Sequence, residues 1–152
     1  MDKHRRVIAP EILLEEYRQL LADESIDALP LVISGSSMSP FLVHGRDTVY
    51  LSRPDGQIKK GDVLLYRRNS GAYILHRVYK IENNSYTMVG DAQTELEQGI
   101  TAEQVIAIMT SALRKGKMQQ PGTFWWEFFR KFWLNVIPLR PFFIKLYNII
   151  CK

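Results

Sequence analysis

Short strand-like segments alternate with turn signals through the middle of this 152-residue chain, and their spacing constrains the fold most. Residues that favour turns, mainly Gly, Asn, Asp and Pro, interrupt the apolar segments at 54–56, 69–71 and 82–85. Strands are expected at 47–51, 62–67, 72–81, 86–89 and 105–113. Strands spaced about ten residues apart are typical of antiparallel sheet. We therefore expect a mainly β fold, a small coiled antiparallel sheet that resembles a barrel.

Helical segments are expected on both sides of this sheet. Pro10 suits the first turn of a helix over 10–23, and Leu13, Tyr17 and Leu20 follow it at helical spacing. A polar loop at 94–99 and a helical turn at 101–104 are expected before the last strand. The chain then divides into an N-terminal helix and linker, a β core, and a linker with a helical tail. These parts span 1–28, 29–118 and 119–152.

Charge and cysteine content exclude several classes of protein. The net charge is +4, but residues 1–123 hold 15 basic and 15 acidic side chains, so the excess lies in the tail. A neutral body argues against a nucleic-acid partner. The single Cys151 cannot form a disulfide framework, and neither metal-ligand spacing nor a glycine-rich phosphate loop is present. We expect no metal and no organic cofactor.

A serine-rich bend at 34–40 follows the apolar run 29–33 and ends at a proline, which is how a chain leaves a strand and presents a hydroxyl. A serine nucleophile needs a base. His76, within an expected strand, and Asp91, in a later turn, are the residue types of a base and its carboxylate. The alternatives are an ordinary loop, a hydrogen-bonded strand histidine and a turn aspartate. Sequence spacing does not show that the three residues meet.

Five short motifs occur in an order that resembles the signal peptidase I family, whose fold the self-cleaving repressors of the SOS response share. They cover the chain from Leu31 to about Lys117. The motifs are Gly35-Ser36-Ser37-Met38-Ser39-Pro40, Gly45-Arg46-Asp47, Lys60-Gly61-Asp62-Val63, His76-Arg77-Val78 and Gly90-Asp91.

The resemblance implies that Ser37 is the nucleophile, His76 the general base and Asp91 the acidic residue. Asp91 is then expected to hold the imidazole or to stabilise its charge. Most bacterial members have a lysine base, whereas a histidine is found in the endoplasmic-reticulum and spore-former type. A histidine with a pKa near ~6.5 accepts a proton at neutral pH, which fits this role. The Ser37 amide is a natural oxyanion donor, and the hydroxyl of Ser36 or Ser34 is expected to assist it.

Two positions have other expected roles. Gly35 occupies the place of the family's oxyanion serine, so that donor is missing from its usual position. Asp62 lies in a turn and is expected to hold the turn geometry. His4 and His44, in a charged terminus and a glycine-adjacent turn, are expected to be solvated surface residues.

The tail is aromatic and basic. Polar side chains at three- and four-residue steps predict a helix over 124–137 with a wide aromatic face, followed by prolines and a shorter apolar piece at 142–150. This composition favours a helix that lies at a membrane surface, since the apolar runs are too short to span a bilayer. The alternative is packing on the β body or on another subunit. The expected membrane contacts are Trp125, Trp126, Phe129, Phe132 and Trp133.

The expected function is that of a serine endopeptidase that cleaves a signal or leader segment from a precursor protein or peptide. The charged first residues contain no apolar segment, so we expect neither a signal peptide nor an N-terminal transmembrane helix. We expect a membrane-associated protein whose catalytic core is cytoplasmic. One alternative is a self-cleaving regulator, although no DNA-binding domain fits before Leu31. Another is a catalytically silent, membrane-associated peptide-binding module.

Overall fold

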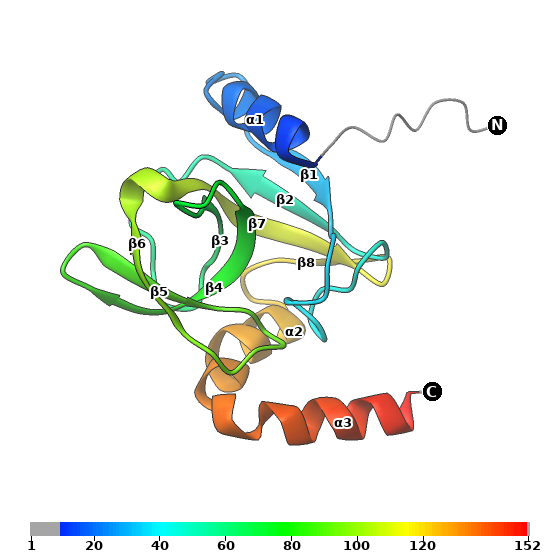
Figure 1. The fold of residues 1–152 in the computed structure, drawn as a ribbon. Coiled ribbons are helices and arrows are strands. Elements are labelled where there is room, and N and C mark those ends of the chain that lie inside the picture. The colour runs from blue at the N-terminus through cyan, green and yellow to red at the C-terminus, as the bar shows by residue number, and fades with distance from the viewer. Residues whose placement is uncertain (1–9, 152) are drawn as a thin grey trace.

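A curled antiparallel sheet organises residues 10–151, which are the residues that the computed structural model describes (Figure 1). The strands lie side by side in the order β1-β2-β7-β3-β4-β5-β6, and β8 pairs with β7. They are β1 (Leu29–Val32), β2 (Thr48–Ser52), β3 (Val63–Arg67), β4 (Tyr73–Glu82), β5 (Ser85–Val89), β6 (Glu97–Thr101), β7 (Val105–Arg114) and β8 (Lys117–Gln119).

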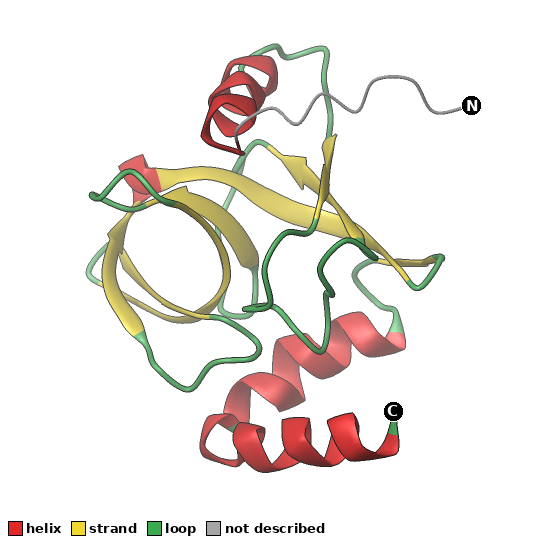
Figure 2. Ribbon diagram, turned by 45° about the vertical axis from the view of Figure 1, so that its right-hand side comes forward, coloured by secondary structure: helices red, strands yellow, loops and turns green. Residues whose placement is uncertain are grey.

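The predicted mainly antiparallel sheet is confirmed, and it resembles a barrel without closing into one. Strands β3 to β6 curl almost into a ring (Figure 2), whereas β1 and β6 end the strand order and no pairing joins them within residues 10–151. Two strands also lie where none was expected. β6 overlaps the predicted polar loop at 94–99, because an edge strand with one buried side chain, Ile100, needs little apolar pattern. β8 is a three-residue edge strand beside β7.

The long strand β7 connects the two halves of the sheet. It pairs with β2 along one edge. Along the other edge its first residues pair with β3 and its last residues pair with β8. The 3₁₀ turn η1 (Ala102–Gln104) leads into this strand, as the predicted helical turn at 101–104 requires. One strand therefore borders two separate hydrophobic clusters.

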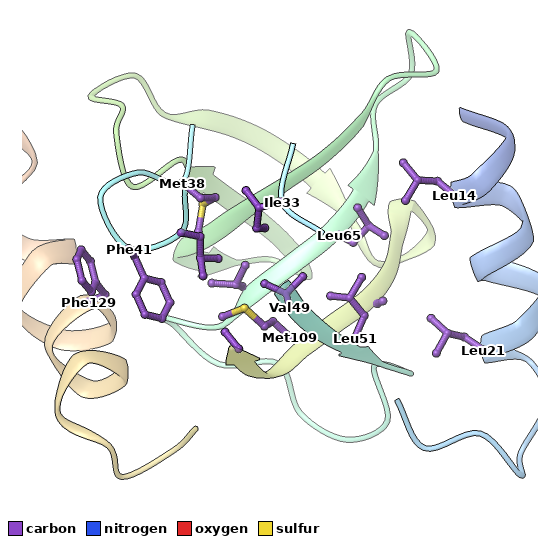
Figure 3. Packing of buried hydrophobic residues seen from close by; sticks show 14 of the residues in the cluster. Leu14, Leu21, Ile33, Met38, Phe41, Val49, Leu51, Leu65, Met109 and Phe129 are labelled. Carbon is purple, nitrogen blue, oxygen red and sulfur yellow. The ribbon is translucent and has the colours of Figure 1, made fainter. Parts of the chain in front are cut away.

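The smaller cluster fills the curl and the larger one lies between the rest of the sheet and the helices. The curl holds Leu64, Tyr66, Val78, Met88 and Ile100. The larger cluster collects side chains from helix α1 (Pro10–Leu21), from the bend at 34–40 and from the C-terminal tail (Figure 3). Its members include Leu14, Leu21, Ile33, Met38, Phe41, Val49, Leu51, Leu65, Met109, Phe129 and Trp133. The helix predicted over 10–23 is thus confirmed to within two residues.

The helix expected over 124–137 is confirmed over residues 124–135, where α-, π- and 3₁₀-helical turns follow one another without a break. A π-helical turn breaks the α-helical spacing on which the expected polar stripe depends, and Pro138 lies in a 3₁₀ turn. No helix among residues 10–151 is long and apolar enough to cross a bilayer. The tail elements are α2 (Phe124–Glu127), η2 (Phe128–Phe132), η3 (Trp133–Asn135), η4 (Ile137–Leu139) and α3 (Arg140–Ile150).

The aromatic side chains of the tail are divided between core and solvent. Phe129 and Trp133 are buried, so the prediction that they contact a membrane was wrong. The Phe129 ring stacks on Phe41 of the domain, with ring centroids 4.7 Å apart. Trp125 and Phe132 remain exposed. The expected alternative, packing on the β body, holds for Phe129 and Trp133, and the partly buried Trp126 and Phe128 pack against the same cluster.

Candidate active site

The serine-rich bend is anchored by buried neighbours on both sides of Ser37. Ile33 donates its N–H to the carbonyl of Asp47, and Met38 is buried in the larger cluster. Gly35 adopts a positive φ of 85°, a conformation that glycine tolerates best, and donates its N–H to His44 Nδ1 at 3.0 Å. Between these anchors Ser37 is partly exposed. The local sequence therefore holds Ser37 at a fixed position while leaving it accessible.

The turn after β5 contacts the backbone of Ser37. Ala92 donates its N–H to the Ser37 carbonyl at 2.9 Å. A Cβ on Gly90 would lie only 2.6 Å from the same carbonyl oxygen, so the close approach requires glycine. Within residues 10–151, no hydrogen bond uses the N–H of Ser37. That donor is consequently available to an oxyanion.

A cavity and an open strand edge lie beside Ser37. On the side of β4 that faces β5, pairing begins only at Arg77, so residues 73–76 have no strand partner there within residues 10–151. An extended peptide can add to such an edge through main-chain hydrogen bonds. The cavity has a volume of about 150 Å³. Its lining residues come from the bend and from β4, and they are Ile33, Ser34, Gly35, Ser37, Met38, Tyr73, Ile74 and Leu75.

His76 is buried on β4 and belongs to a polar network that reaches β6. Its Nδ1 lies 3.4 Å from the hydroxyl oxygen of Tyr66. Tyr66 donates its hydroxyl proton to Glu97 Oε1 at 2.5 Å. Arg68 donates Nε–H to the other oxygen of Glu97 at 2.6 Å. The imidazole is therefore connected to a carboxylate through a tyrosine.

Burial lowers the pKa of His76 to about 4, and nearby charges modify this effect. Glu97 and Asp91 raise the pKa, while Arg68 lowers it. Burial and Glu97 raise the pKa of Tyr66, which keeps its phenol protonated. At neutral pH the imidazole is uncharged, which is the form that can accept a proton.

Asp91 is fully buried and its carboxylate binds Arg77, not His76. The guanidinium donates to both Asp91 oxygens, each at 2.8 Å, and to the Gly61 carbonyl at 2.9 Å. Asp91 therefore does not hold the imidazole by a direct hydrogen bond. Its remaining influence on His76 is electrostatic, since its charge favours the protonated imidazole. The other expectation for Asp91, that it stabilises the charge on His76, stays a prediction.

The C-terminal tail holds the turn that contains Asp91. Trp133 donates its indole N–H to the Asp91 carbonyl at 2.8 Å. The buried Arg140 donates to the carbonyls of Gly90 and Gln93, both at 2.9 Å, and to that of Trp133. The first turn of α3 also helps to line a cavity of about 660 Å³. The lining residues are Arg68, His76, Ala92, Gln93, Thr94, Glu95, Leu96, Glu97, Pro141 and Ile144.

The turn at 90–93 contains one of the three predicted catalytic residues and is connected to the other two. It contains Asp91, it bonds the Ser37 carbonyl, and Ala92 and Gln93 line the cavity of His76. No hydrogen bond joins Ser37 to His76 within residues 10–151, and the two side chains line different cavities. Catalytic hydrogen bonds are often long without substrate and tighten when it binds.

The supporting residues have mixed outcomes. Ser34 lines the cavity beside Ser37, whereas Ser36 is exposed and outside that lining. Asp62 accepts the N–H of Lys59 at 2.7 Å, so it holds a turn as expected. His44 is exposed, as expected, but also supports Gly35. His4 lies outside the described residues. Within residues 10–151 no group of three or more His, Cys, Asp or Glu side chains could hold a metal ion.

Sequence reasoning missed four residues that build the site, namely Tyr66, Arg68, Glu97 and Arg140. Tyr66 occurs two positions after Leu64 in a predicted strand, which places both on one face. The register that pairs Leu64 with His76 was not readable from the sequence. Glu97 lies in a strand that was expected to be loop, and Arg140 lies in a segment that was expected to contact lipid.

Comparison with known proteins finds no matching family model, no similar curated protein and no similar solved structure.

Proposed function

We propose that the protein is a serine endopeptidase, similar to the signal peptidase I family, that cleaves a signal or leader segment from a precursor. The observation that carries the proposal is the shared turn at 90–93. It bonds the backbone of the partly exposed Ser37 and lines the cavity of the neutral His76. The turn thereby connects the proposed nucleophile with the proposed base, and the open edge of β4 at residues 73–76 offers a place for a peptide beside Ser37.

The chemistry needs only these side chains and water. Ser37 Oγ forms a bond to the scissile carbonyl carbon while its proton passes to His76, and the carbonyl electron pair moves to oxygen. When the carbonyl re-forms, the C–N bond breaks and the leaving nitrogen takes the proton from His76. Water then attacks the acyl ester and gives a proton to His76. Ser37 regains that proton as the ester bond breaks, which releases the second product as a carboxylic acid.

The backbone around Ser37 suits the charged intermediate. The N–H of Ser37, which no hydrogen bond uses within residues 10–151, can donate to the oxyanion, and Ser34 lines the same cavity. Residues 73–76 can hold the substrate in an extended conformation, with alternate side chains directed toward the cavity. Binding in this mode places a peptide bond next to Ser37.

The test is cleavage of a panel of signal and leader peptides by the purified full chain between pH 4 and 9. Ser37→Ala and His76→Ala should both abolish cleavage, and a serine-reactive probe should label Ser37. Ser70→Ala, in an exposed turn, is the control and should keep full activity. Cleavage that survives Ser37→Ala contradicts the proposal. Peptide binding without cleavage or labelling supports the silent binding module.

We also infer that the exposed face of α3 binds an anionic membrane surface. Phe142 and Ile149 are each 65% exposed, and with Leu146 they recur at helical spacing on one face. Lys145 is exposed on the same helix. Residues 124–152 contain five basic side chains and one acidic side chain. Apolar side chains beside basic ones are the combination that interfacial helices use.

Vesicle sedimentation tests this surface. The full chain should bind vesicles of mixed zwitterionic and anionic lipid more tightly than purely zwitterionic ones, and added salt should weaken that binding. Phe142→Glu together with Ile149→Glu should abolish it. Ile81→Glu, at another exposed apolar position, is the control. Absence of binding to both kinds of vesicle, or equal binding by the double variant, overturns the inference.

A further inference from the structure

The two ring nitrogens of His76 have different surroundings. Nδ1 contacts Tyr66 at 3.4 Å, whereas Nε2 makes no hydrogen bond within residues 10–151. A neutral imidazole carries its proton on one nitrogen and accepts through the other. Which nitrogen is protonated decides which of them can take a proton from a serine.

The hydrogen bonds of Tyr66 determine the answer. A phenol has a single O–H donor, and Tyr66 gives it to Glu97 at 2.5 Å. A carboxylate can only accept, so this direction cannot be reversed. The Tyr66 oxygen is left as an acceptor, and its contact with His76 requires the proton to be on Nδ1. The lone pair is then on Nε2.

We propose that Tyr66, held by Glu97, is a positioning residue that keeps His76 in the Nδ1–H tautomer, with Nε2 as the acceptor for the Ser37 proton. The inference rests on the proposed peptidase function for its catalytic meaning, but the tautomer itself is independent of catalysis. Tyr66 and Glu97 thereby do the work expected of Asp91, with a tyrosine placed between carboxylate and imidazole.

The charged groups around His76 agree with this assignment. Glu97 receives a charge-assisted hydrogen bond from Arg68, which orients its carboxylate. The Asp91 oxygens are both bonded to Arg77, and Asp91 contributes only its charge. When His76 takes a proton from Ser37, Glu97 is the carboxylate linked to it through hydrogen bonds.

His44 provides an internal reference because its bonding is opposite. Its Nδ1 accepts the N–H of Gly35, so its proton is on Nε2 when the ring is neutral. The two histidines are therefore expected to show opposite tautomers in one sample.

Nitrogen-15 NMR of the full chain, labelled at histidine and measured at pH 8, reads the tautomers directly. His76→Gln identifies the His76 signals by their loss. The His76 signals should show a protonated Nδ1 and an unprotonated Nε2. Tyr66→Phe should move them toward the Nε2–H form, whereas the control Tyr50→Phe, on β2, should not. An Nε2–H form in the unsubstituted protein, or no change in Tyr66→Phe, overturns the proposal.

Kinetics supplies the second readout. Tyr66→Phe should lower kcat about 10- to 100-fold with little change in KM, because the base is misplaced while the peptide edge is intact. Glu97→Gln should lower kcat and move the acid limb of the pH profile to lower pH, since a negative charge near His76 is lost. An unchanged kcat in Tyr66→Phe contradicts the positioning role. The expected tautomer without any peptide cleavage would instead refute the peptidase function and leave the tautomer assignment standing.

Discussion

Asp91 and Glu97 each bind an arginine, but the two carboxylates have different roles. Asp91 is 0% exposed and both of its oxygens bind Arg77. Glu97 is 28% exposed and divides its oxygens between Arg68 and Tyr66. Only Glu97 is connected to His76 by hydrogen bonds. We infer that Asp91, whose two oxygens both bind Arg77, mainly stabilises the fold. Glu97, whose oxygens bind Tyr66 and Arg68, influences the imidazole through Tyr66.

The alternation of β4 explains this difference. His76 and Arg77 are consecutive, so their side chains leave the sheet on opposite faces. Arg77 meets the buried Asp91 in the turn at 90–93, where an unpaired charge is costly. His76 lies at the mouth of the curl, where Glu97 on the edge strand β6 retains access to solvent. The neighbouring residues His76 and Arg77 therefore belong to different hydrogen-bond networks, one partly open to solvent and one buried.

The largest expected loss of stability comes from removing the Asp91 carboxylate. Asp91→Ala leaves Arg77 buried without its partner, which should lower the free energy of unfolding by about 3–5 kcal/mol. Urea denaturation at pH 7 measures this loss. Asp55→Ala, in the exposed pair with Arg53, is the control and should cost less than about 1 kcal/mol. Equal losses in the two variants would contradict a structural role for the Asp91–Arg77 pair.

Acid should destabilise the protein through His76. Its pKa is about 4 in the folded protein and 6.5 in an unperturbed chain, so between these values the unfolded state binds more protons. Stability therefore falls as pH drops from 6.5 to 4, by up to about 3 kcal/mol. Denaturation at several pH values should show this loss for the unsubstituted protein and for His44→Gln, but not for His76→Gln. Parallel curves for all three would rule it out.

Gly90→Ala tests whether the turn at 90–93 positions Ser37. The new Cβ would press on the Ser37 carbonyl, which should cost about 1–3 kcal/mol of stability. Displacement of Ser37 should also lower kcat/KM by about tenfold or more. Gly116→Ala, which has open space but a positive φ, is the control for backbone strain and should leave cleavage unchanged. Unchanged kinetics in Gly90→Ala would show that the close approach does not position Ser37.

The smallest loss of stability is expected on substitution of Glu97. Glu97→Gln keeps a hydrogen-bonding group beside Arg68 and Tyr66 and removes a partly exposed charge, so the loss should stay below about 1 kcal/mol. Urea denaturation at pH 7, beside Asp91→Ala, measures the contrast. A loss as large as that of Asp91→Ala would remove the distinction between the two carboxylates.

The central strands of the sheet could be predicted from local sequence, whereas the edge strands β6 and β8 could not. Turn residues such as Asn69 and Gly71 interrupt the apolar segments, so the hairpin between β3 and β4 was predicted closely. β6 and β8 are edge strands whose side chains are mostly exposed, and they carry little apolar pattern. The tail was misjudged in part because Phe129 and Phe132 look alike in sequence, whereas only Phe129 faces the core.

The candidate site shows the same limit. The bend around Ser37 was predictable, because glycine, serine and proline act through their own backbone preferences. The partner of Asp91 was not, because the sequence offers both His76 and Arg77 at neighbouring positions. The role of Arg140 was hidden for a similar reason, since its three carbonyl partners lie far away in the chain or on another turn.

The sequence by itself determined the positions of β2, β3, β4, β5 and β7, the position of the serine bend and the residue types available for catalysis. These properties depend on interactions between near neighbours, which composition and spacing record. Tertiary structure alone decided that the sheet stays open, that Phe129 and Trp133 of the aromatic tail are buried, and that Tyr66 links His76 to Glu97 while Asp91 binds Arg77. Those outcomes depend on strand register and on the face from which each side chain leaves the sheet, and contacts between distant residues set both.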